Sequence, residues 1–92
     1  MSQYKNMLKI LSKKNIDYKV VEIWDRKCNS KITELKFCYS DNLWAVYIIR
    51  FYYESKLEII NLNHIFNART KRVFYSPNIE RDLCYNFGFL PF

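Results

Sequence analysis

The sequence predicts an α+β fold: an N-terminal helix, an antiparallel β-meander of about five strands, and a short C-terminal helix. Two observations carry this prediction. Apolar residues recur at helical spacing near the N-terminus, and the period changes to two after residue 17. The chain has 92 residues without a repeat, linker or low-complexity stretch, so we expect residues 1–92 to form a single small domain. Half of the residues are apolar, which is too many for a disordered chain.

Both predicted helices have recognisable ends. Residues 3–14 form the first helix, with Ser2 as the N-cap and Asn15 as the stop. Its apolar face consists of Tyr4, Met7, Leu8 and Leu11. Its basic face consists of Lys5, Lys9 and Lys13. The second helix is predicted over Ile79–Phe87, with Ser76 or Asn78 as its cap and Gly88 after its last turn.

Five runs rich in β-branched and aromatic residues predict the strands. They are Tyr18–Asp25, Ile32–Tyr39, Leu43–Tyr53, Leu57–Phe66 and Lys71–Tyr75. The third run is apolar on both faces and has one charged residue, Arg50, which predicts a central strand. Short polar segments separate the runs, and several of them contain Asn, Asp or Ser, which favour turns.

Composition excludes several classes of function. The one glycine, Gly88, excludes glycine-rich phosphate loops, because each of these needs several residues of unusual backbone freedom. Cys28, Cys38 and Cys84 are not closely spaced, and they predict neither a disulfide framework nor a zinc site. We therefore expect no metal and no cofactor. Reduced thiols and the absence of a long apolar run predict a cytoplasmic protein without membrane contact, in its own cell or in a host cell.

The charge pattern predicts a polyanionic partner. The formal net charge is +6, and Arg69, Lys71 and Arg72 flank the aromatic pair Phe74 and Tyr75. Lysine and arginine clusters neutralise phosphates, and exposed rings stack on bases. The helix–strands–helix order resembles double-stranded-RNA-binding modules, although the lysine-rich start of their second helix is absent here. The residues expected to bind nucleic acid are Lys5, Lys9, Lys13, Lys14, Arg69, Lys71 and Arg72.

The aromatic content predicts a second kind of surface. Two tryptophans, eight tyrosines and seven phenylalanines exceed what one small core hides, so some rings should be exposed. The candidates are Tyr52, Tyr53, Tyr75, Phe89 and Phe92. Because aromatic patches also mark protein interfaces, the alternative function is a phage- or mobile-element-encoded inhibitor of a host enzyme, such as a defence nuclease. Unpaired strand edges would also allow a homodimer.

The sequence carries one pattern typical of catalysis. Asp25 followed by Glu34-Leu35-Lys36 resembles the acidic-residue-then-ExK signature of restriction-type metal-dependent nucleases, which implies a divalent cation held by the two carboxylates. The flanking Pro-Asp of that signature is absent, and the nuclease core is larger than this chain. We therefore predict a non-enzymatic module that binds a nucleic acid or nucleoprotein. Its phosphate contacts should come from the first helix and the Arg69–Arg72 turn, gathered into one basic patch.

Overall fold

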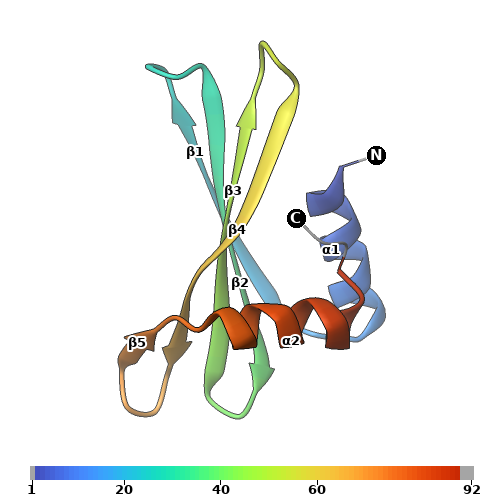
Figure 1. Cartoon of the computed structure of the whole chain (residues 1–92), viewed down its shortest axis with the longest axis vertical. Coiled ribbons are helices and arrows are strands. Elements are labelled where there is room, and N and C mark those ends of the chain that lie inside the picture. Colours follow the sequence, from blue (N-terminus) through green and yellow to red (C-terminus); the bar gives the residue numbers. More distant parts are fainter. Residues whose placement is uncertain (1, 90–92) are drawn as a thin grey trace.

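The computed structural model describes residues 2–89 and confirms the α+β architecture (Figure 1). The elements in chain order are α1 (Gln3–Lys13), β1 (Tyr18–Asp25), β2 (Ser30–Ser40), β3 (Leu43–Tyr52), β4 (Leu57–Asn67), β5 (Arg72–Phe74) and α2 (Pro77–Phe87). Most boundaries agree with the sequence prediction within two residues. Neither helix within residues 2–89 is long and apolar enough to cross a membrane.

The five strands form one antiparallel sheet in the order β1-β2-β3-β4-β5. Each strand pairs with its neighbour in the chain, because every connection is a short turn and antiparallel strands can be joined in this way. Non-glycine residues in the left-handed region shape these turns, including Asn29, Asn42, Lys56 and Lys71. The apolar strand β3 lies in the centre, as its sequence predicts.

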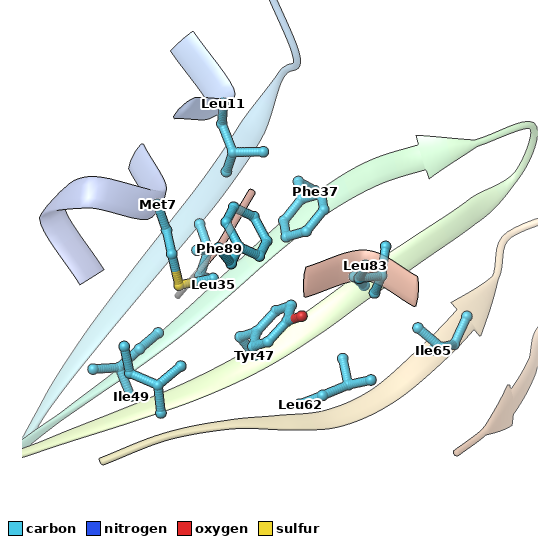
Figure 2. Close-up of a cluster of buried hydrophobic side chains, with 12 residues drawn as sticks. Met7, Leu11, Leu35, Phe37, Tyr47, Ile49, Leu62, Ile65, Leu83 and Phe89 are labelled. Atoms are coloured by element: carbon cyan, nitrogen blue, oxygen red, sulfur yellow. The ribbon is translucent and has the colours of Figure 1, made fainter. Parts of the chain in front are cut away.

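Both helices pack on one face of the sheet, which we call the helix face. Met7 and Leu11 from α1 and Leu83 from α2 meet the inward side chains of the strands, and all three are buried (Figure 2). The strand residues of this core are Leu35, Phe37, Ala45, Tyr47, Ile49, Ile60, Leu62 and Ile65. The other side of the sheet, which we call the open face, is covered by neither α1 nor α2.

Capping contacts fix the N-terminus of α1. The Ser2 hydroxyl accepts a hydrogen bond from the backbone N–H of Lys5 at 3.3 Å, as the sequence predicts. Glu58 on β4 adds a cap from outside the helix: its carboxylate accepts from the backbone N–H groups of Gln3 at 3.0 Å and Tyr4 at 3.3 Å. It also accepts from the Ser2 hydroxyl at 2.6 Å. Helix α1 has no acidic residue in its first turn, so Glu58 supplies the negative charge that this end favours.

A β-bulge in β4 decides which of its side chains reach the open face. In the register with β3, Tyr47 pairs with Leu62 and Val46 pairs with His64, which leaves Asn63 without a partner. Side chains alternate along a regular strand, so the extra residue shifts the alternation by one position. As a result Ile65 points into the core, while His64 and Phe66 lie on the open face.

Candidate nucleic-acid interface

A shallow cavity of about 290 Å³ lies on the open face, toward the end of the sheet that carries the β4–β5 turn. Strands β1 to β4 line it with Lys19, Lys36, Trp44, Val46, His64 and Phe66. The pairing register explains this set, because Lys19, Lys36, Val46 and His64 occupy successive positions of one row across four strands. Trp44 and Phe66 pair directly in the next row. The site therefore combines two aromatic rings with two lysines and an imidazole.

Lysine ammonium groups lie over both rings of this cavity. The Nζ of Lys19 is 5.8 Å from the centroid of the Trp44 ring, and the Nζ of Lys71 is 6.0 Å from that of Phe66. Both distances are in the range of cation–π interaction. Lys36 forms an ion pair with Glu34 at 3.3 Å, whereas Lys19 and Lys71 form none within residues 2–89. No carboxylate of residues 2–89 therefore neutralises the ammonium group of Lys19 or Lys71.

The predicted basic residues do not form one patch. Helix α1 carries Lys5, Lys9, Lys13 and Lys14, all exposed. The β4–β5 turn carries Arg69 and Lys71, and Arg72 follows as the first residue of β5; all three are exposed. Figure 1 shows α1 and this turn at opposite sides of the molecule. The Nζ of Lys14, the C-cap residue of α1, lies 5.8 Å from the ring centroid of Phe87 in α2. Helical periodicity placed the lysines on one helix face, but periodicity carries no information about where the helix docks.

The predicted exposed rings have different outcomes. Tyr75 is exposed, and its hydroxyl donates to Glu80 at 3.4 Å. Tyr52 and Tyr53 are half-buried. The expectation that Phe89 is exposed is wrong: its side chain is only 5% exposed and packs edge-on against Phe37 and Tyr47 in the core. The left-handed Gly88 ends α2, and the residue that follows it reaches the core. Phe92 lies outside the described residues.

An aromatic cluster at the opposite end of the sheet joins Tyr53, one of the predicted exposed rings, to Trp24 and Phe51, which were not predicted. Trp24 is 49% exposed, and its ring centroid is 4.9 Å from that of Tyr53, which in turn lies 5.0 Å from that of Phe51. In the register Trp24, Lys31 and Phe51 occupy one row across β1, β2 and β3. The available signal was the side-chain period of two in a strand, which places Trp24 on the same side of β1 as Tyr18 and Val20.

The structure separates the residues of the nuclease-like pattern. Asp25 lies opposite Ser30, and Glu34 is four residues further along β2, which corresponds to about 13 Å. Each carboxylate has a basic partner: Arg50 donates to Asp25 at 3.2 Å, and Lys36 pairs with Glu34. The Arg50 hydrogen bond lowers the pKa of the Asp25 carboxyl below its usual value. Residues 2–89 contain no group of three or more His, Cys, Asp or Glu that could hold a metal ion.

His64 is also far from Cys38 and Cys84, with which it could otherwise form a pair of nucleophile and general base. Cys38 on β2 and His64 on β4 are separated by β3, which corresponds to about 10 Å, and the Cys38 thiol donates to the carbonyl of Ser40 at 3.1 Å. Cys84 lies on α2, across the sheet from His64. Burial raises the pKa of the Cys84 thiol, with a further contribution from Glu80. A raised pKa lowers the thiolate fraction that a nucleophile needs.

No protein-family model, curated protein or solved structure matches this chain. The geometry of its own residues is therefore the basis for a functional proposal.

Proposed function

We propose that this chain is a non-enzymatic binding module for single-stranded nucleic acid, and that the ligand lies across the open face of the sheet. The observation that supports this proposal is that Trp44 and Phe66 line the cavity and that a lysine ammonium group lies over each ring. A basic groove with aromatic side chains is the combination that binds single strands without strong sequence preference. Its volume, about 290 Å³, is at the lower end for small-molecule pockets.

Each part of the site has a role in this proposal. A base stacks on Trp44 or Phe66 and displaces the ammonium group that lies over the ring in the free protein. Lys19 and Lys71, freed from the rings, contact the flanking phosphates. The His64 imidazole provides a hydrogen-bonding group beside the stacked base. Arg69 lies in the same turn as Lys71, Arg72 begins β5 directly after it, and both extend the basic surface past the edge of the cavity.

The test is a fluorescence anisotropy titration with an oligothymidylate of about six nucleotides, a length that one such surface accommodates. We expect Trp44→Ala to weaken binding by roughly 5-fold to 100-fold, since stacking on one ring contributes about 1–3 kcal/mol. Trp44→Phe keeps a ring and should restore most of the affinity. The matched control is Trp24→Ala, which removes the other tryptophan, outside the cavity.

Salt dependence tests the phosphate contacts separately. Lys19→Ala combined with Lys71→Ala should make the slope of log affinity against log salt shallower by about 0.7 for each lysine. Each phosphate contact that is lost reduces the number of counterions released on binding. Lys5→Ala combined with Lys9→Ala on α1 should leave the slope for this short ligand unchanged. Equal affinity of the wild type, Trp44→Ala and Trp24→Ala proteins would contradict the proposal.

A second candidate function, a protein-binding inhibitor or regulator, is favoured by the cluster of Trp24, Phe51 and Tyr53. Tryptophan and tyrosine are over-represented among the residues that dominate binding energy at protein interfaces. For this function, Trp24→Ala would abolish capture of the partner, while the charge substitutions on the open face would have little effect. Affinity purification from the native host, with and without nuclease treatment, distinguishes the two candidates.

A further inference from the structure

The two edges of the sheet differ in how well they are protected. Strand β5 has three residues, one of them Arg72, and the chain reaches Pro77 soon after it. Strand β1 has eight residues and no proline, and its register with β2 contains no bulge. Seven of its eight residues are exposed, and the eighth, Asp25, is half-buried. Long, regular, apolar edges pair readily with another strand unless charges, prolines or bulges prevent it.

Strand β1 also exposes apolar side chains on both faces of the sheet. Val21 and Ile23 are 53% and 60% exposed on the open face, and Val20 and Trp24 are exposed on the helix face. The outer N–H and C=O groups of an exposed edge strand are hydrogen-bonded by water in the free protein, and they form a row with which another extended segment can pair. Within residues 2–89 the strand order leaves no further strand on this side of β1. The edge therefore lacks a strand partner that the described chain could supply.

We propose that β1 is a dimer interface, in which its free edge pairs antiparallel with β1 of a second copy across a twofold axis at Val21. This inference goes beyond the proposed function and does not depend on it. The dimer has one continuous sheet of ten strands, with the helices of both copies on the same side, because antiparallel pairing about such an axis keeps the two faces aligned.

The sequence of β1 is self-complementary in this register. Residues directly opposite each other in the pair must lie on the same face of the sheet. The twofold axis therefore lies midway between the two copies of one residue, which are opposite each other. With Val21 on the axis, two apolar side chains meet at the centre and Tyr18 lies opposite the partner's Trp24. Lys19 then lies diagonally from the partner's Asp25, within reach of a long side chain. Placing Glu22 on the axis would instead bring two carboxylates together, which is unfavourable.

The charges of β1 also fit a second copy better than a strongly charged partner. Glu22 is paired with Lys31 at 3.6 Å and Asp25 with Arg50 at 3.2 Å, so both acids are compensated within the protein. The edge therefore presents five apolar or aromatic residues, with Lys19 as the charged residue of β1 that has no ion pair within residues 2–89, and a second copy of β1 is a segment of the same kind. Because one strand pair is a small interface, we expect a dissociation constant in the range of about 1 µM to 1 mM.

Sedimentation velocity over about 10 µM to 1 mM tests the proposal in this affinity range. We expect the wild type to shift from monomer to dimer, and Val21→Lys to remain monomeric because it places two lysines opposite each other. The matched control is Leu57→Lys, at a residue that is 51% exposed on β4, which should dimerise like the wild type. Circular dichroism of both variants verifies that they are folded.

A disulfide trap tests the register itself. In a background with Cys28→Ser, Cys38→Ser and Cys84→Ser, Val21→Cys should form an intermolecular disulfide on mild oxidation. Directly opposite residues in an antiparallel pair have Cα atoms about 4.5–5.5 Å apart, which is within disulfide range. Val73→Cys, on the exposed β5 edge, is the matched control and should stay monomeric. A wild type that remains monomeric at every concentration, or equal crosslinking at positions 21 and 73, would overturn the proposal.

Discussion

Glu58 connects strand β4 to the start of α1, and its removal should weaken the whole domain. Its carboxylate accepts from the Ser2 hydroxyl at 2.6 Å and from the backbone N–H groups of Gln3 and Tyr4 at 3.0 and 3.3 Å. These N–H groups have no acceptor inside the helix, since the first four N–H groups of any α-helix lack one. The contact therefore links the helix to a residue more than 50 positions away in sequence.

The magnitude follows from these contacts. A hydrogen bond to a charged group contributes about 1.5–3 kcal/mol, and a half-buried N-cap contributes about 0.5–2 kcal/mol. Since solvent can replace part of the lost contacts, we expect Glu58→Ala to lower the free energy of unfolding by about 2 kcal/mol. Glu58→Gln keeps one acceptor oxygen and loses the interaction with the helix dipole, so we expect a loss of about 1 kcal/mol.

Urea unfolding followed by tryptophan fluorescence and by circular dichroism at 222 nm measures both variants. The matched control is Glu54→Ala, in the exposed β3–β4 turn, where Glu54 forms no hydrogen bond or ion pair within the described chain. This control should lie within about 0.5 kcal/mol of the wild type. If Glu58→Ala and Glu54→Ala unfold at the same midpoint, the cap contributes nothing and our account of α1 docking is wrong.

Three further predictions concern backbone strain and pH. Lys56 has φ +56°, so Lys56→Gly should raise the unfolding free energy by about 0.5–1 kcal/mol; a lower midpoint in urea would refute this. Gly88 has φ +73° and open space around an added Cβ, so Gly88→Ala should lose about 1 kcal/mol from strain alone, and an unchanged midpoint would show no strain. Because the pKa of Asp25 is lower in the folded protein than the 3.8 of the unfolded chain, its carboxylate stabilises the fold at pH values above 3.8. This contribution disappears as the pH falls through the lower pKa of the folded protein. The difference between wild type and Asp25→Asn in urea should therefore shrink below about pH 4, and a constant difference would contradict the ion pair with Arg50.

Local signals in the sequence predicted most of the secondary structure. The change of period at residue 17 and the turn residues between strands depend on neighbouring positions alone, and the structure confirms the elements derived from them. Ser2 and Gly88 cap their helices as predicted, because both act through their own backbone or the next turn. The strand order followed as well, since short turns leave a meander as the simplest arrangement.

The candidate site was harder to predict because it depends on residues far apart in sequence. Its cavity lies among Lys19, Trp44 and Phe66, and only the pairing register brings them together. Of the residues predicted to bind nucleic acid, Lys71 lies over a ring of this site, whereas the α1 lysines lie elsewhere. The exposure of Phe89 was predicted wrongly, since the last apolar residues of a chain can pack into the core as readily as they extend from it.

The bulge in β4 is the feature on which the open-face site depends most directly. Strict alternation from Ile60 and Leu62 would turn His64 and Phe66 toward the helices and leave Ile65 outside. The unpaired Asn63 reverses this order beyond position 62, so the cavity acquires an imidazole and a ring while the core keeps Ile65. The same residues without the extra position would give a different surface.

Deleting Asn63 should be tolerated, although a deletion within a central region of a strand usually inverts every side chain beyond it. Removal of this unpaired residue leaves Leu62 facing inward, His64 outward and Ile65 inward, which is the alternation of a regular strand. Deleting Asn61, an exposed residue that pairs with Ile48, would instead turn Leu62 to the open face and Asn63 into the core when the bulge is lost, and it would exchange the two faces of β4 beyond the deletion when the bulge is kept. Circular dichroism and urea unfolding should show a folded protein for the first deletion and loss of cooperative unfolding for the second. If both deletions unfold the protein, or both spare it, Asn63 is not the residue that sets the orientation of His64 and Phe66.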